Sequence, residues 1–301
     1  MDIRQFEDRK RGHIRHSLDP AHQAFGLGGL DRVRLPHEAL PDLSLDEVSL
    51  KTPCLGRSLP TPFYVAGMTA GHGDAPALNR RLALACARRG WAMGVGSQRR
   101  ELEGGASVPS VDDWRGLREE VPGLSLFANL GMSQLLGAPI ARVRAVVESI
   151  RAQALVVHAN PLQECLQPEG TPRFRGAVDA LRALCSELEV PVVLKETGCG
   201  FSPRTLERLK NTGLAAIDVS GLGGTHWGRI EGARAEEIPG ADLFARAAAT
   251  FADWGVSTVD SVVSAARILP ATTEIWASGG VRSGLDAAKL IALGAHRVGY
   301  A

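Results

Sequence analysis

The sequence predicts an α/β protein, a (β/α)8 TIM barrel that carries an N-terminal extension. Three observations lead to this fold class: eight short apolar runs, helical patterns between them, and polar or glycine-rich clusters directly after most of the runs. Short, nearly continuous apolar runs are typical of parallel strands that are buried on both faces. Eight parallel strands that alternate with helices close into a barrel.

The expected strands and helices follow one another in a regular order. The eight apolar runs are Thr61–Gly67, Ala92–Ser97, Ser125–Leu130, Ala154–Ala159, Pro191–Glu196, Leu214–Val219, Glu274–Ser278 and Arg297–Tyr300. The helical patterns are Ala75–Arg89, Ala138–Arg151, Ala177–Glu189, Pro203–Lys210, Asp242–Asp253, Thr258–Ile268 and Leu285–Leu293. A doubly wound sheet is the competing architecture, but it usually carries a complete G-x-G-x-x-G when it binds a dinucleotide. The chain contains no complete match to that motif.

The chain divides into two expected parts. Residues 1–60 form an extension that lies over the barrel mouth, and residues 61–301 form the barrel. Within the extension, Leu43–Val48 is a candidate strand. The longest gap between strands contains His226–Gly240, which we expect to be a loop with the character of an active-site lid. The sequence stops just after the eighth strand, so we expect the last barrel helix to be missing from this chain.

Composition narrows the class of protein. Lys and Arg number 34 against 33 acids, and this balance argues against a nucleic-acid footprint. No apolar run approaches the roughly 18 residues of a membrane span, and Met1–His16 lacks the apolar core of a secretory signal. The five cysteines form no C-x-x-C pair, which indicates a reducing, cytoplasmic setting without a zinc module.

Polar and glycine-rich clusters follow seven of the expected strands. Barrel enzymes build their active sites on these loops, at the carboxyl ends of the strands. In strand order the clusters are Gly67-Met68-Thr69, Ser97-Gln98-Arg99, Asn129, His158 to Glu164, Lys195 to Gly200, Asp218 to Thr225, and Ser278 to Arg282. Seven clusters in the same position are hard to assign to chance, so we expect the active site at this end of the barrel.

Two of the clusters suggest an anionic cofactor. Glycines after strand seven, with the N-terminus of the next helix and strand eight, form the usual phosphate site of a barrel, although Ser278-Gly279-Gly280 alone would favour a simple tight turn. Lys195 lies in an apolar strand, where a lysine is costly without a partner. It either pairs with an acid such as Glu196 or Asp218, or it places a cation beneath an anionic ring; we favour the second interpretation.

Two further clusters suggest an anionic substrate. His158, Asn160, Gln163 and Glu164 together could hold a substrate and a hard cation, with Glu164 as the plausible Mg²⁺ ligand. Taken singly, such loop residues are more often solvated or capping residues. The basic run from Arg9 to His13 is usually a solvated surface, but it could also be an arm that clamps a phosphate.

These motifs together resemble one family, the type 2 isopentenyl diphosphate isomerases, from residue 9 to the end. The resemblance is carried by Arg9-Lys10-x-x-His13, Met68-Thr69, Gly96-Ser97-Gln98-Arg99, Asn129-Leu130-Gly131, His158-x-Asn160-x-x-Gln163-Glu164, Lys195-Glu196-Thr197-Gly198-Cys199-Gly200, Asp218-Val219-Ser220-Gly221-x-Gly223-Gly224-Thr225 and Ser278-Gly279-Gly280-x-Arg282. One departure is Ala70, where the family usually has glycine.

The resemblance implies interconversion of isopentenyl and dimethylallyl diphosphate by a 1,3-proton shift, with reduced FMN as cofactor and NADPH as reductant. It implies FMN at Gly67, Met68, Thr69, Ser97, Asn129, Lys195, Ser220, Thr225, Gly279, Gly280, Val281, Arg282 and Ala301. It implies substrate at Arg9, Lys10, His13, Ser97, Gln98, Arg99, His158, Asn160 and Gln163, and Mg²⁺ at Glu164. Lys195, Gln163 and His158 would be catalytic, and the protein would be a homo-oligomer, a tetramer or octamer.

Three alternatives compete with this interpretation. An FMN-dependent 2-hydroxy-acid oxidase needs a histidine base and an arginine clamp after strand six, where this chain has Leu222 and Thr225. A nucleotide dehydrogenase needs a nucleophilic cysteine loop, for which Cys199 is the faint candidate. A barrel used only for binding would not need Lys195, Gln163 and Glu164.

Overall fold

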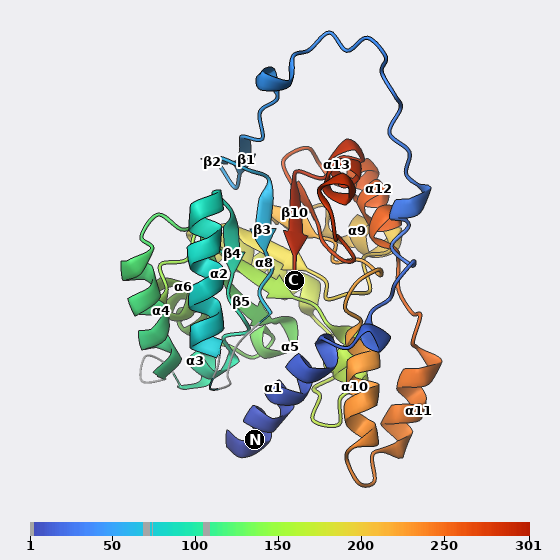
Figure 1. Cartoon of the computed structure of the whole chain (residues 1–301). Helices are drawn as coiled ribbons and strands as arrows, with labels where there is room; N and C mark the ends of the chain where they lie inside the picture. Colours follow the sequence, from blue (N-terminus) through green and yellow to red (C-terminus); the bar gives the residue numbers. More distant parts are fainter. Residues whose placement is uncertain (1–2, 69–72, 74, 105–108) are drawn as a thin grey trace.

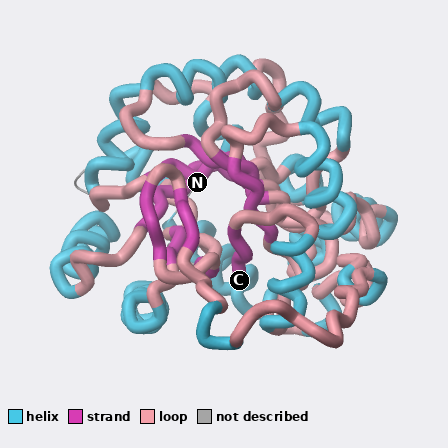
Figure 2. The backbone as a smooth tube through the Cα atoms, turned by 90° about the horizontal axis from the view of Figure 1, so that it is seen from above, coloured by secondary structure: helices cyan, strands magenta, loops and turns pink. Residues whose placement is uncertain are grey.

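A computed structural model of the chain describes residues 3–68, 73, 75–104 and 109–301. Its centre is a closed barrel of eight parallel strands in the order β10-β3-β4-β5-β6-β7-β8-β9. The strands are β3 Phe63–Val65, β4 Ala92–Gly94, β5 Leu126–Gly131, β6 Ala154–His158, β7 Val192–Lys195, β8 Ala216–Asp218, β9 Glu274–Ala277 and β10 Arg297–Tyr300. All eight fall on the expected apolar runs, which confirms the fold class. Figure 2 shows the strands inside a ring of helices.

The seven expected helices are also confirmed. They are α2 Ala75–Arg89, α6 Ile140–Ser149, α8 Ala177–Glu187, α9 Pro203–Leu209, α11 Asp242–Thr250, α12 Thr258–Ile268 and α13 Gly284–Ala292. Further helices form where the sequence pattern predicted none: α3 Arg99–Gly104, α4 Pro109–Glu120, α5 Met132–Leu135, α7 Pro161–Leu166 and α10 Trp227–Glu236. No helix among the described residues is long and apolar enough to cross a membrane.

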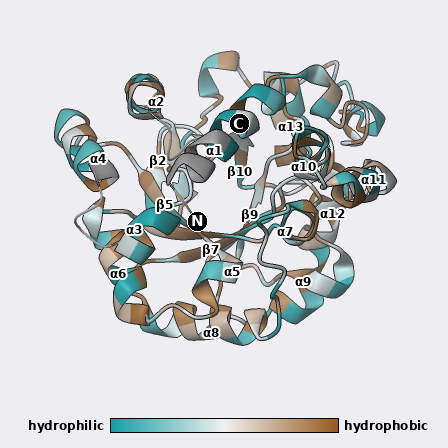
Figure 3. Cartoon of the chain, turned by 90° about the horizontal axis from the view of Figure 1, so that it is seen from below, coloured by the Kyte–Doolittle hydropathy of each residue, from teal (hydrophilic) through white to brown (hydrophobic). Residues whose placement is uncertain are grey.

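Two apolar layers hold the barrel together. The larger layer lies between the strands and the surrounding helices. Figure 3 shows apolar residues both on the central strands and on the helices around them. The smaller one fills the barrel itself, where the Trp276 ring lies 5.1 Å from that of Tyr64 and 5.3 Å from that of Phe127. These large side chains close the interior below the mouth, as in barrels generally. The ends of the strands are therefore the place where a ligand can enter.

The N-terminal extension runs from one end of the barrel to the other (Figure 1). Helix α1, Ile3–Ser17, packs against α10 at the carboxyl ends of the strands. The chain then follows α12 and α13, where Gly28 O accepts from Val259 N at 3.1 Å and Leu30 O from Lys289 Nζ at 2.7 Å. It ends in a hairpin of β1, Thr52–Cys54, and β2, Arg57–Leu59.

The outer loop, residues 33–50, arches away from the barrel in Figure 1. Our candidate strand at Leu43–Val48 is wrong, because a 3₁₀ turn occupies Leu45–Glu47. The physical reason is local: Glu47 Oε2 accepts from Ser44 N at 2.6 Å, a capping box that favours a helical turn over an extended strand.

Candidate active site

Two clefts adjoin at the barrel mouth. The glycine cleft, about 630 Å³, is bordered by Gly198, Gly224, Gly279, Gly280 and Gly299. The arm cleft, about 810 Å³, is bordered by residues of α1 and of the loops after β4, β5 and β6. The two clefts share Met68, Lys195, Thr197 and Trp227, so they form one continuous site.

The structure brings most of the expected site residues to these two clefts. Around the glycine cleft lie Met68, Lys195, Ser220, Thr225, Gly279, Gly280, Val281, Arg282 and Ala301. Around the arm cleft lie Arg9, Lys10, His13, Gly67, Met68, Ser97, Arg99, Asn129, His158, Asn160, Gln163, Glu164 and Lys195. Gln98 is placed differently, since it is buried beneath the mouth, where its Oε1 accepts from Asn129 N at 3.2 Å. Thr69 and Ala70 lie outside the described residues.

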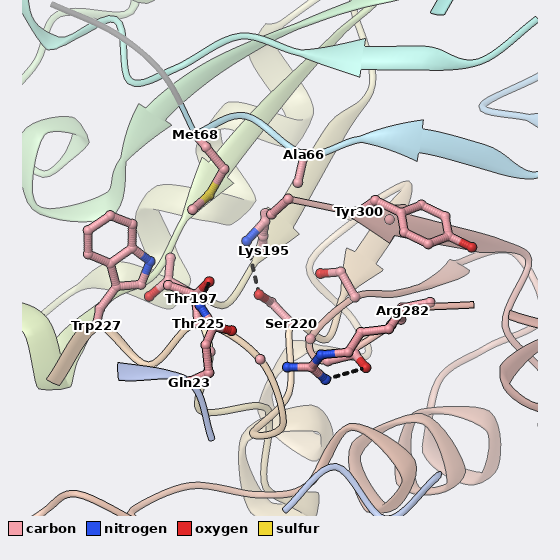
Figure 4. Close-up of a pocket in the computed structure, with 18 residues that line it drawn as sticks. Gln23, Ala66, Met68, Lys195, Thr197, Ser220, Thr225, Trp227, Arg282 and Tyr300 are labelled. Carbon is pink, nitrogen blue, oxygen red and sulfur yellow. Dashed lines mark hydrogen bonds between the residues drawn. The ribbon is translucent and has the colours of Figure 1, made fainter. Parts of the chain in front are cut away.

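Lys195 ends β7 and points into the junction of the clefts (Figure 4). Its Nζ donates to the backbone oxygen of Glu196 at 2.7 Å and to Ser220 Oγ at 3.0 Å. Neither acceptor is a carboxylate, so the ammonium charge is not neutralised by Glu196 or Asp218 through these contacts. Ser220 has a φ of 37°, which is costly for a residue with a side chain and typical of functional sites. The cation is therefore held in place and left available to an anion.

The buried carboxylate of Glu196 organises the loop after Lys195. Its Oε2 accepts from the backbone N of Thr197 at 2.6 Å, of Cys199 at 2.5 Å and of Gly200 at 3.0 Å. Burial raises the pKa of Glu196 to about 7, against the lowering effect of these donors. Burial, with Glu196 nearby, also raises the pKa of the Cys199 thiol. A thiol that resists ionisation is a poor nucleophile, which removes the support for a cysteine-dependent dehydrogenase.

The glycine turn after β9 can hold an anion through its backbone. Gly279 and Gly280 have φ of 104° and 76°, and a Cβ on Gly280 would lie 2.3 Å from Gly223 O, so only glycine fits. Within the described residues, the N–H groups of Gly279, Gly280 and Val281 have no acceptor. Just before α13, Asp286 Oδ2 accepts from Arg282 N and Ser283 N, each at 3.0 Å. The glycine turn therefore offers free N–H donors next to the first turn of α13.

The arm cleft is lined by cations. Arg9 and Lys10 come from α1, and Arg99 comes from α3, where its Nε donates to Glu103 Oε1 at 2.8 Å. Burial, followed by the neighbouring charge of Arg9, lowers the pKa of Lys10 to about 8. Burial also lowers the pKa of the Arg9 guanidinium, although Glu169 and Glu231 oppose the shift. Cations crowded in this way gain from an anionic ligand, which would relieve both burial and mutual repulsion.

A buried carboxylate on α10, missed in the sequence, anchors the arm. Glu231 is fully buried, and its Oε1 accepts from His13 Nε2 and from Gln163 Nε2, each at 2.8 Å. Its Oε2 accepts from Arg234, which also donates to Glu169 Oε1 at 3.1 Å. Burial alone would raise the pKa of Glu231, but the hydrogen bond and charge of His13 and the charge of Arg234 lower it to about 2. Our expectation of a loop at His226–Gly240 was wrong, because α10 occupies most of this range. Through Glu231, this helix connects α1 to the site.

His158 lines the arm cleft and is neutral. Its Nδ1 lies 2.8 Å from Asn129 Oδ1, while Asn129 Nδ2 donates to Val95 O at 3.0 Å. Because the Asn129 oxygen must accept, His158 carries its proton on Nδ1 and leaves Nε2 as an acceptor. Burial and the charges of Lys195 and Lys10 lower the pKa of His158 to about 3. His158 can therefore accept a hydrogen bond from a ligand but adds no positive charge.

Glu164 stands at the edge of the arm cleft on α7. One carboxylate oxygen accepts from Asn160 Nδ2 at 3.1 Å, and the other accepts from Thr171 N at 2.6 Å. No group of three His, Cys, Asp or Glu side chains gathers as a metal centre in the part of the chain that the structure describes. A single carboxylate beside an open cleft fits a Mg²⁺ ion that completes its coordination with ligand oxygens and water.

The oxidase alternative lacks its catalytic groups in the structure. Leu222 is buried and pairs its backbone N with Val256 O at 2.9 Å, away from both clefts. His226, the nearest histidine in sequence, is also buried, and its Nδ1 accepts from Arg229 N at 3.2 Å as the N-cap of α10. Arg229 itself donates to backbone oxygens of Ala252 and Gln23. None of these residues offers a base or a carboxylate clamp to the site.

Comparison with known proteins agrees with this geometry. A family model described as FMN-dependent dehydrogenase matches residues 125–301. An isopentenyl-diphosphate delta-isomerase of Legionella pneumophila (strain Corby) is 51% identical over 99% of this chain and 85% of the relative. Proteins of the same name from Bdellovibrio bacteriovorus and a Nostoc species are 49% and 41% identical, over 85% and 84% of their lengths.

The barrel and its glycine cleft thus define an FMN-dependent barrel protein. The chain belongs to the type 2, FMN-dependent isopentenyl-diphosphate delta-isomerase family. The described residues fit FMN, since the glycine turn offers free N–H groups for a phosphate and Lys195 offers a cation toward the shared end of the cleft. Ser220, Thr225, Met68 and Trp227 would surround the ring and the ribityl chain.

Proposed function

We propose that this protein interconverts isopentenyl diphosphate and dimethylallyl diphosphate by a 1,3-proton shift, with reduced FMN in the glycine cleft and the diphosphate in the arm cleft. One observation carries the proposal: the two clefts meet at Lys195, so a flavin ring and a small substrate would share that cation. The cations Arg9, Lys10 and Arg99 match a diphosphate in charge.

Each site residue has a chemical task in this proposal. Reduced FMN, kept reduced by NADPH, would supply the acid and base that add a proton at one carbon and remove one two carbons away. Lys195, fixed by Glu196 O and Ser220 Oγ, would stabilise negative charge on the reduced ring. Gln163, held by Glu231, and His158, held by Asn129, would orient the substrate in the arm cleft.

A metal would complete the diphosphate site. A carboxylate beside a diphosphate repels it unless a cation lies between them. We propose that Glu164 holds Mg²⁺ against the diphosphate, since Mg²⁺ commonly takes one carboxylate together with substrate phosphates and several waters. Its oxygens already hold Asn160 and Thr171 N, which fixes the carboxylate at the edge of the cleft.

The proposed reaction is tested by isotope exchange. Isopentenyl diphosphate incubated in D₂O with the protein and reduced FMN should give deuterium in both product and remaining substrate, with no net use of NADPH. Steady NADPH consumption in proportion to product would instead indicate an oxidoreductase and would refute the proposal.

We also propose that the protein is a cytoplasmic homo-oligomer. All five cysteines are free thiols, as a reducing compartment allows. The outer loop exposes leucines to water, among them Leu40 at 88% and Leu45 at 89%. Apolar side chains on an arching loop gain by burial against a second copy, and the resemblance suggests a tetramer or octamer.

A further inference from the structure

The glycine-rich segment of the extension, residues 22–29, lies against the glycine cleft. Ala24 N donates to Gly224 O at 2.7 Å, and His226 N donates to His22 O at 3.1 Å, so the segment adds a short pairing to the loop after β8. Its backbone approaches closely: a Cβ on Gly223 would lie 2.7 Å from the Cα of Gly28. The segment is thus packed onto the loop that borders the cleft.

Phe25 has an unusual position within this segment. Its side chain is 55% exposed, yet the Arg282 guanidinium carbon lies 4.2 Å from the centre of its ring. Arg282 NH1 also donates to Gly280 O at 2.9 Å and to Gly223 O at 3.2 Å. The ring and the two carbonyls therefore hold the guanidinium beside the glycine turn. Without the ring, one side of a long and flexible side chain would face only water.

Gln23 occupies a second position in the wall of the cleft. Its Nε2 donates to Thr225 Oγ1 at 3.2 Å and to Ser17 O at 3.0 Å, and its backbone forms a bridge with Thr225. Gln23 and Thr225 both line the glycine cleft, on the side of Trp227 (Figure 4). Gln23 thereby fixes Thr225 at the end of the cleft that is away from Arg282.

We propose that residues 22–29 of the extension are part of the FMN site, with Phe25 positioning Arg282 for the phosphate and Gln23 positioning Thr225 for the ring and ribityl chain. The inference rests on the proposed function, because it takes FMN as the occupant of the glycine cleft. The extension would then serve the cofactor as well as the substrate. Phe25 and Gln23 act at opposite ends of FMN. Their effects on affinity can therefore be distinguished with a flavin that lacks the phosphate.

The test is binding of FMN and of riboflavin, which lacks the phosphate, to the apoprotein, followed by flavin fluorescence. An exposed cation–π contact predicts that Phe25→Ala weakens FMN about 2- to 5-fold and leaves riboflavin unchanged. Phe25→Tyr keeps a ring and should bind FMN as the wild type does. Gln23→Ala should weaken both flavins by the same factor, about 2- to 10-fold for one hydrogen bond. Phe174→Ala removes a partly exposed phenylalanine far along the chain and serves as the matched control.

A double-variant cycle decides whether Phe25 acts through Arg282. In an Arg282→Ala background, Phe25→Ala should have no further effect on FMN. Equal weakening of FMN and riboflavin by Phe25→Ala, or full additivity with Arg282→Ala, would overturn the inference. Failure of the wild-type protein to bind either flavin would instead overturn the proposed function, so the two failures are distinguishable.

Discussion

Replacing Lys195 with methionine removes the cation at which the two clefts meet while keeping an unbranched side chain of similar length. The structure indicates that the fold should survive. Of the two residues whose oxygens lose their donor, Ser220 borders a cleft that water can enter, whereas Glu196 is buried. Acceptors that water can reach cost less than fully buried ones, so we expect a loss of about 1–2 kcal/mol in the free energy of unfolding.

The effect on catalysis should be larger. A preorganised donor aimed at developing charge is worth about 2.7–4 kcal/mol, which corresponds to a roughly 10²- to 10³-fold loss in kcat. Lys195 qualifies as preorganised because two hydrogen bonds fix its ammonium and Ser220 is held at a φ of 37° to receive one of them. Methionine fills the space without the charge, so the loss should fall on kcat more than on KM.

Steady-state kinetics and thermal melting of Lys195→Met measure these two effects. Lys210→Met is the matched control, because Lys210 lies on the surface at the end of α9 and pairs with Glu207, away from the clefts. The control should have wild-type kcat. If Lys195→Met turns over within a few-fold of the wild type, the cation takes no part in the reaction and our reasoning about the junction of the clefts is refuted.

Four further predictions concern the arm, the metal and the assembly. Deletion of residues 1–13 removes two cations of the arm cleft and should raise the substrate KM strongly, while the Kd for FMN stays near wild type; an unchanged KM would show that the arm is misassigned. Glu164→Gln should lose activity together with its Mg²⁺ dependence, and full activity in chelator would rule out the metal role. As pH rises through about 8, Lys10 loses its proton and kcat/KM should fall, whereas Lys10→Arg should move this fall to higher pH. Leu40→Asp with Leu45→Asp should lower the mass of the assembly in light scattering, and an unchanged mass would exclude the outer loop from the interface.

The barrel could be predicted because each of its strands can be recognised on its own in the sequence. A strand buried on both faces must be apolar throughout, and β5 and β6 are such runs in the sequence. The outer loop lacks this constraint. Leu43 and Leu45 suggested a strand, but among the described residues no neighbouring strand pairs with them. The capping box of Ser44 stabilises a 3₁₀ turn there instead.

Helix α10 could not be predicted because its glycines suggested a loop. In the structure they allow close packing: a Cβ on Gly232 would lie 2.6 Å from the Cβ of Ala248 on α11. Glycine lowers helix propensity, so this helix depends on its tertiary contacts. Ile230 and Glu231 are both fully buried, and the pair Glu231 and Arg234 has helical spacing. That spacing was the available signal, but a charged residue on a buried face is not expected from sequence alone.

The charge states of the site follow from burial, which a sequence does not give. Burial lowers the pKa of His13 to about 4, so above that pH His13 donates to Glu231 as a neutral side chain, and its charge acts on Glu231 only at lower pH. The pKa of Glu231 is lowered from 4.5 to about 2, so its ionised form stabilises the docked arm above about pH 4.5 and loses this effect as the pH falls toward 2. From pH 5 upward, His13 therefore stays neutral and Glu231 stays ionised. A fall in kcat/KM near pH 8 would then report the loss of charge on Lys10 itself, and not release of the helix that carries it.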